Sequence, residues 1–86
     1  MTMLDATRIR GEILRQCQLR GLGKTICPSE VARKLWPDES NWRGYVNAVR
    51  NEAFALAKEG RVVISQRGEV VVDVTVKWPL RIALPQ

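Results

Sequence analysis

The chain of 86 residues is 45% hydrophobic and 27% charged, which predicts a single folded domain over residues 1–86 rather than a disordered or membrane-spanning chain. Its net charge is +5, from 14 lysines and arginines against 9 acids, and this excess permits partners that carry phosphates or carboxylates. It contains no histidine, the commonest general base and metal ligand, so we expect neither an enzyme nor a bound metal or small-molecule cofactor.

The first predicted element is a helix from Leu4 to Arg20. Its apolar residues recur three or four positions apart, which places them on one stripe of the helix. These residues are Ala6, Ile9, Ile13 and Cys17. Gly21 and Gly23 end the helix, and the β-branched segment Lys24–Ile26 then predicts a short strand.

A second helix is predicted from Pro28 to Trp36, with Cys27 as its N-cap. Proline suits the first helical position because its missing N–H would be unpaired there, and Glu30 completes a capping box in which a thiol replaces the usual hydroxyl. Pro37 ends this helix. A thiol at a helix N-terminus can be reactive, but no base or second cysteine adjoins Cys27 in sequence, so we interpret it as a cap.

The third helix is predicted from Asn41 to Glu59 and is ended by Gly60 in the left-handed conformation. Its buried stripe consists of Trp42, Tyr45, Val46, Val49, Ala53 and Leu56. The opposite arc carries Arg43, Asn47, Arg50, Asn51 and Lys58. Phe54 also points outward in this arrangement.

A valine-rich β-hairpin follows, and its register depends on the length of its loop. A two-residue loop at Arg67–Gly68 would pair Ile64 with Val71. It would also pair Val62 with Asp73, which places an acid on the buried face.

A three-residue loop over Gln66–Gly68 avoids that acid and is the register we predict. The resulting pairs are Ile64 with Val70 and Val62 with Val72. The buried face of the second strand then carries Val70, Val72 and Val74. Arg67 lies at the tip of the hairpin in this register.

The alternating segment from Leu80 to Leu84 predicts a final short strand, entered after Pro79. A first helix, then two helices that meet at a tight bend, and then a hairpin form the order of a winged helix-turn-helix. We therefore predict an α+β fold with a three-helix core followed by a β-hairpin wing.

The outer arc of the third helix is the candidate functional surface. Arginine and asparagine bind guanine and adenine edges bidentately in a major groove, and both also bind phosphate. With Arg67 on the wing, this arc predicts a nucleic-acid-binding domain whose partner is double-stranded DNA. A plain solvated face is the competing interpretation, since any amphipathic helix needs polar residues on its outer side.

Other basic and aromatic residues have simpler interpretations. Arg33 and Lys34 interact favourably with the dipole at the end of the second helix, with phosphate positioning as the second interpretation. The three tryptophans are more consistent with core filling than with base stacking, because a small domain needs large side chains. They are Trp36, Trp42 and Trp78.

The outward Phe54 leads to an alternative function. Either it packs beneath the wing, or it marks a surface that binds a protein partner or a second copy of the chain together with the exposed hairpin edge. In that second case the domain would be a protein-interaction or homodimerisation module that does not bind nucleic acid.

The expected compartment is the cytoplasm. No stretch approaches the roughly 18 apolar residues of a spanning helix, and Asp5 precedes any apolar run at the N-terminus, so we expect no membrane association. With no secretion signal, Cys17 and Cys27 are predicted to be reduced thiols rather than a disulfide.

A set of residues carries a resemblance that covers nearly the whole chain from Ile9 onward. They are Cys27–Arg33, Trp42–Arg43, Val49–Arg50, Ala53, Leu56, Gly60, Val62, Ile64, Ser65–Gln66, Gly68 and Pro79–Arg81. Together they resemble a small, mostly bacterial family that is catalogued as a domain of unknown function and is winged-helix-like. The resemblance implies the fold, and it implies no activity, ligand or catalytic residue.

Overall fold

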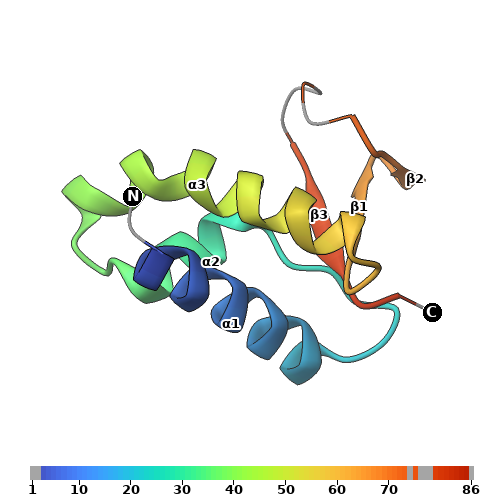
Figure 1. Cartoon of the computed structure of the whole chain (residues 1–86), viewed down its shortest axis with the longest axis horizontal. Coiled ribbons are helices and arrows are strands. Elements are labelled where there is room, and N and C mark those ends of the chain that lie inside the picture. The colour runs from blue at the N-terminus through green and yellow to red at the C-terminus, as the bar shows by residue number, and fades with distance from the viewer. Residues whose placement is uncertain (1–2, 74, 76–78, 86) are drawn as a thin grey trace.

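The computed structural model describes residues 3–73, 75 and 79–85, and shows three helices followed by a small antiparallel sheet (Figure 1). The helices are α1 Met3–Arg20, α2 Pro28–Leu35 and α3 Glu39–Lys58. The strands are β1 Val63–Gln66, β2 Glu69–Val70 and β3 Arg81–Ala83, in the order β2-β1-β3. The predicted α+β fold, with a hairpin wing after three helices, is confirmed.

The ends of the helices follow from local chemistry. At the end of α3, Gly60 adopts a φ of 77° and donates its N–H to Ala57 O at 3.0 Å, while Arg61 donates to Leu56 O at 3.0 Å. These two bonds form a Schellman motif, which only a residue tolerant of positive φ allows. At its start, α3 begins two residues before the predicted Asn41, at Glu39.

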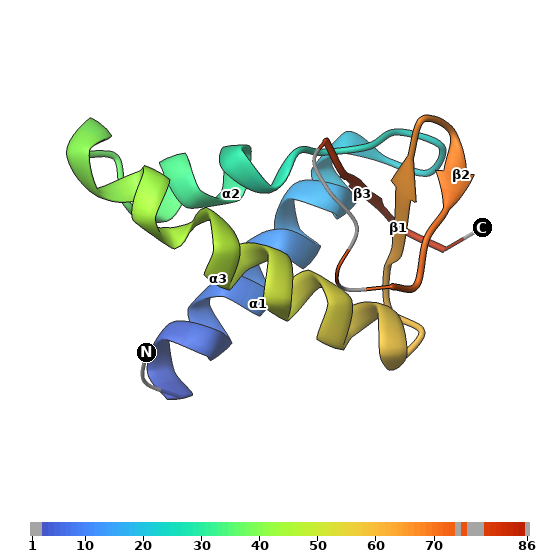
Figure 2. The same ribbon diagram turned by 90° about the horizontal axis from the view of Figure 1, so that it is seen from above.

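The core lies between the three helices and one face of the sheet. α1 contributes Ile9, Ile13 and Cys17, and all of them are almost completely buried as the stripe predicted. The remaining buried apolar residues come from α2, from α3, and from the sheet and the segments that adjoin it: Ile26, Val31, Ala32, Val49, Ala53, Phe54, Leu56, Val62, Ile64, Leu80 and Ile82. Figure 2 shows the sheet at the C-terminal end of α3, where the last turns of that helix meet β1.

The segment before α2 is not the predicted strand over Lys24–Ile26. It makes one isolated bridge, in which Ile26 and Ile82 exchange N–H to O bonds of 2.8 Å. Lys24 and Thr25 form no ladder pair with β3, so Ile26 alone makes the bridge. The bridge nevertheless ties the chain between α1 and α2 to β3.

The hairpin has the two-residue loop, so the predicted three-residue register is wrong. Ser65 pairs with Val70, and the N–H of Val71 donates to Ile64 O at 2.9 Å. Arg67 and Gly68 occupy the loop with φ values of 54° and 84°. Positive φ at both central residues defines the type I′ turn, whose twist matches that of the two strands.

A register shift of one residue moves every side chain of a strand to the opposite face. Val71 therefore packs against the core, while Val70 and Val72 are 68% and 86% exposed, the reverse of the prediction. The acid that argued against this register never reaches the core, because β2 ends at Val70 and Asp73 is exposed. The predictions for Val74 and Trp78 lie outside the described residues.

Candidate nucleic-acid interface

The outer arc of α3 is polar and open to solvent along its N-terminal half. Arg43 and Asn47 are exposed there, one helical turn apart. Asn51 and Lys58 are exposed further along the same arc. Four of the five residues predicted on this helix are therefore accessible to a large partner.

Arg50, the fifth, is half-buried and is held by its neighbours. Its guanidinium carbon lies 5.6 Å from the centre of the Phe54 ring. Asp73 lies near enough for Arg50 to affect its titration. Hydrogen bonds from the hydroxyl and N–H of Thr75, at 2.7 and 2.8 Å, lower the pKa of Asp73, and the positive charge of Arg50 lowers it further. Arg50 is thus a link between α3 and the segment after β2.

Phe54 is buried, so the prediction that it points outward is wrong. Only 5% of its surface is exposed. Val72 lies beside it, and a shallow hollow lined by Asn51, Phe54, Lys58 and Val72 separates the helix from the returning chain. The one-residue shift of the hairpin explains this, because the chain leaves β2 early and crosses back over α3 (Figure 2). Phe54 therefore packs beneath the segment that follows the wing.

At the opposite end of α3, the indole of Trp42 carries two arginines. The guanidinium carbon of Arg33, from α2, lies 4.6 Å from the ring centre, and that of Arg43 lies 4.8 Å from it. Both distances are within the range of a cation–π interaction. Trp42 itself is half-buried and packs against the core. The sequence indicated Arg33 as a helix-dipole partner first and a phosphate-positioning residue second, but it did not predict the contact with Trp42, because contacts between helices have no local signal.

Two stacked aromatic rings also lie at this end of α3. Trp36 and Tyr45 stack with ring centres 3.7 Å apart and planes 2° from parallel. Arg8 of α1 lies 5.6 Å from the centre of the Trp36 ring. Trp36 and Trp42 thus pack against the core, as predicted, and also hold arginines at the surface.

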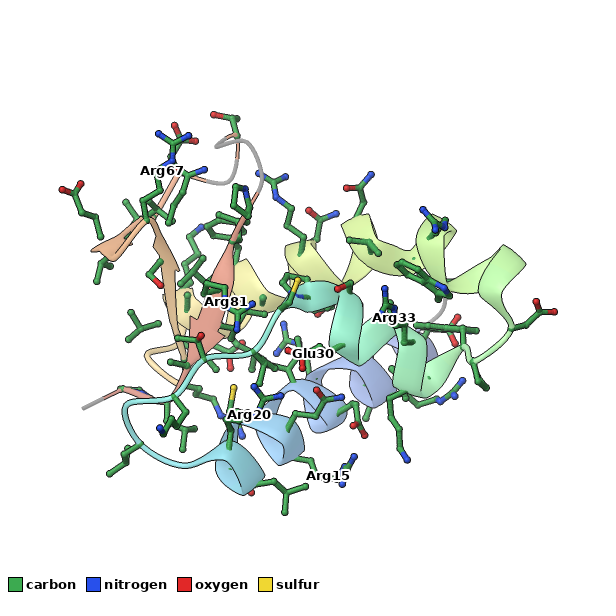
Figure 3. The ribbon with its side chains drawn as sticks, turned by 180° about the vertical axis from the view of Figure 1, so that it is seen from behind. Arg15, Arg20, Glu30, Arg33, Arg67 and Arg81 are labelled. Carbon is green, nitrogen blue, oxygen red and sulfur yellow. The ribbon has the colours of Figure 1, made fainter. Side chains whose placement is uncertain are left out.

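Arg67 lies at the hairpin tip, as predicted, and it is exposed. Figure 3 shows it at the end of the wing, apart from Arg33 on α2. Figure 2 shows that the turn between β1 and β2 lies on the side of the sheet away from α3. The structure therefore does not join Arg67 to the outer arc of α3.

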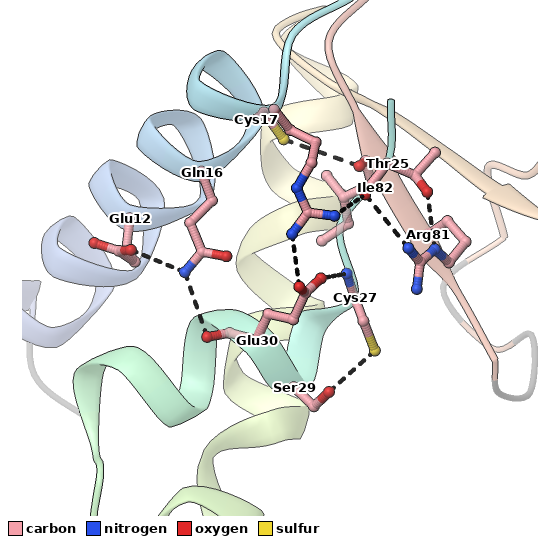
Figure 4. Close-up of polar contacts among 10 residues, drawn as sticks. Glu12, Gln16, Cys17, Thr25, Cys27, Ser29, Glu30, Arg81 and Ile82 are labelled. Atoms are coloured by element: carbon pink, nitrogen blue, oxygen red, sulfur yellow. Dashed lines mark hydrogen bonds and ion pairs between the residues drawn. The ribbon is translucent and has the colours of Figure 1, made fainter. Parts of the chain in front are cut away.

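The start of α2 is held by a polar network (Figure 4). The carboxylate of Glu30 accepts the N–H of Cys27 at 2.6 Å, which confirms the acidic half of the capping box, and it pairs with Arg20 at 2.7 Å. Partial burial acts to raise the pKa of Glu30, but these two donors bring it below its usual value. Arg81 donates to Thr25 Oγ1 at 2.9 Å and extends the network to β3.

Neither cysteine has the surroundings of a nucleophile. The thiol of Cys17 is buried beneath α1, and burial raises its pKa to about 11. The sulfur of Cys27 accepts a hydrogen bond from Ser29 at 3.1 Å, which fits its position as the N-cap. Over residues 3–73, 75 and 79–85, no three cysteine or acidic side chains group together as metal ligands.

The family of this chain follows from its sequence. The family described as protein of unknown function (DUF3253) matches residues 6–85, and the chain belongs to it. No curated protein matches the chain. None of the helices in the described part of the chain is long and apolar enough to cross a membrane.

Proposed function

We propose that this winged-helix domain binds double-stranded DNA through the outer arc of α3. The observation that carries the proposal is the exposure of Arg43, Asn47, Asn51 and Lys58 on one side of a single helix. An α-helix fits the major groove, where asparagine recognises adenine and arginine recognises guanine or phosphate. The net charge of +5 favours the approach to a polyanion.

The exposure of the individual side chains supports different roles within this proposal. Arg43 and Asn47 are exposed on the first half of α3, so we propose that they approach the groove most closely. Arg50 is half-buried against Phe54, so its role is to support the neighbouring exposed residues of α3. Arg67 is outside this proposal, since the β1–β2 turn that carries it lies at the end of the sheet remote from α3 (Figure 2).

The test is a titration of labelled duplex DNA at several salt concentrations, followed by fluorescence anisotropy. We expect binding whose logarithmic affinity falls linearly with the logarithm of salt concentration. Asn47→Ala should reduce discrimination between sequences by about 1–3 kcal/mol, the value of one bidentate base contact. Absence of wild-type binding at low salt would rule out the function.

A second candidate is homodimerisation through the hairpin edge. Phe54 no longer supports it, but Val70 and Val72 do, because they are 68% and 86% exposed next to the short edge strand β2. A dimer would cover these valines, and its mass would fall on dilution. Val72→Ser should then yield a monomer in sedimentation experiments, with Leu19→Ser on α1 as an apolar control that is also largely exposed, at 72%. A wild type that is monomeric at every concentration rejects this candidate.

A further inference from the structure

The two arginines on Trp42 come from different helices and meet at one ring. Arg33 is in the last turn of α2, and Arg43 follows Trp42 on α3. The guanidinium carbons lie 4.6 and 4.8 Å from the same ring centre, so, whichever faces of the ring they occupy, they are no farther apart than these two distances together. Stacking uses the face of a guanidinium and leaves its N–H edges able to donate hydrogen bonds.

The charge balance at this site differs from that of α1. Each of the four arginines of α1 pairs with a carboxylate: Arg8 with Asp5, Arg10 with Glu52 and Glu59, Arg15 with Glu12, and Arg20 with Glu30. Arg33 and Arg43 pair with no carboxylate among the side chains that the structure describes. Two like charges side by side are unfavourable in isolation, and a bound anion would offset their repulsion.

The site is also preorganised. Trp42 packs against the core, and the stacked Trp36 and Tyr45 rings lie in the same part of the fold, at the α2–α3 turn and the first half of α3. A guanidinium held on such a ring loses less side-chain entropy when it binds than one that is free to rotate. Arg33 and Arg43 are both exposed, so a large anion can reach them.

We infer that Arg33 and Arg43 form a clamp for the backbone phosphates of duplex DNA, with Trp42 as the positioning residue. The inference rests on the proposed function. It assigns phosphate binding and base recognition to two different sets of residues. The clamp fixes the position of the helix on the duplex without reading sequence, and Asn47 with Asn51 reads base edges. The planar guanidinium suits this role because it donates two parallel hydrogen bonds to phosphate oxygens.

The experiment measures how salt changes duplex affinity for wild type, Arg33→Ala, Arg43→Ala and the double variant. Loss of one phosphate contact lowers the magnitude of the log-affinity against log-salt slope by about one, and the double variant should lose about two. Affinity should fall by the same factor for duplexes of unrelated sequence. Arg15→Ala is the matched control, because it removes one charge on α1, on the far side of α2 from α3 (Figure 3), and should keep the wild-type slope.

A second variant tests the ring. Trp42→Leu keeps both charges but removes the surface that holds them, so the slope should stay while affinity falls about equally on all sequences. Circular dichroism and urea unfolding confirm that each variant remains folded.

Four outcomes would overturn the clamp. If the arginine variants keep the wild-type slope, the clamp is rejected, while duplex binding and the proposed function are retained. Losses that depend on the sequence of the duplex would move both arginines to base recognition. If the arginine variants change the salt slope of binding to single-stranded DNA but not to duplex DNA, the duplex is rejected as the ligand. Absence of all wild-type binding would instead reject the proposed function, and the clamp with it.

Discussion

The two ends of α3 each combine an aromatic ring with arginine, yet they form opposite environments. Trp42 is half-buried and holds Arg33 and Arg43 at the surface. Phe54 is buried, and Arg50 covers it together with the segment after β2. The same chemical pair is therefore a candidate binding site at one end and a part of the core at the other. The two ends differ because the segment after β2, which is distant in sequence, covers Phe54.

The contrast between the two ends predicts that substitutions at one end change DNA affinity and substitutions at the other change stability. Substitutions at the Trp42 end should mainly change binding, because its arginines are exposed. Substitutions at the Phe54 end should mainly change the free energy of unfolding, because they disturb packed atoms.

The largest effect is expected at Phe54. Phe54→Ala removes a buried ring and should lower the free energy of unfolding by about 3–5 kcal/mol, as measured by urea denaturation. Val72→Ala, in the same hollow but 86% exposed, should cost less than about 1 kcal/mol. A small loss for Phe54→Ala would mean that the ring is accessible, and the contrast between the two ends would disappear.

A smaller effect is expected at the start of α2, the helix that carries Arg33 to Trp42. Glu30→Gln weakens the capping box and the pair with Arg20, and should cost about 1 kcal/mol at pH 7. The partly exposed position of Glu30 limits the contribution of the ion pair.

The effect of Glu30→Gln on the free energy of unfolding should depend on pH. The pKa of Glu30 is lower in the folded state than its ordinary value of 4.5, so the unfolded chain takes up the proton first as the pH falls. The stability that this carboxylate supplies is present above that ordinary value and is lost as the pH falls through the folded value. The difference between wild type and Glu30→Gln should accordingly shrink on acidification, and a difference independent of pH would contradict this role.

Arg50 and Arg43 provide the direct comparison between the two ends. Arg50→Ala should lower stability by about 0.5–1 kcal/mol, since it removes a partly buried cation–π contact. Arg43→Ala should change stability by less than about 0.5 kcal/mol. Thermal unfolding of the two variants, measured in parallel, checks this order. The reverse order would place the structural arginine at the Trp42 end.

The smallest effect is expected at Arg67, which belongs to neither end. Its φ of 54° is unusual for a side chain larger than asparagine, and Asn-Gly is the favoured pair for a type I′ turn. Arg67→Asn should therefore raise the free energy of unfolding by about 0.5 kcal/mol. It should also leave the salt slope of DNA binding unchanged, because the β1–β2 turn lies at the end of the sheet remote from α3. A reduced slope would return Arg67 to the interface.

The sequence alone determined the three helices and most of their inward faces. The stripe from Ile9 to Cys17, the Cys27–Glu30 capping box and the Gly60 helix end are local patterns, so they appear in the structure as predicted. Exposure of Arg43, Asn47, Asn51 and Lys58 followed from the same helical period. Such features depend on residues no more than a few positions apart.

The tertiary structure decided the rest. The register of the hairpin depends on the length of its loop, and the two-residue loop exchanged the faces of Val70, Val71 and Val72 relative to the prediction. That exchange brought the returning chain over Phe54, and the packing of α2 on α3 placed Arg33 on Trp42. These contacts join residues far apart in the chain, and their free energy depends on all the surfaces that meet, so no local pattern encodes them.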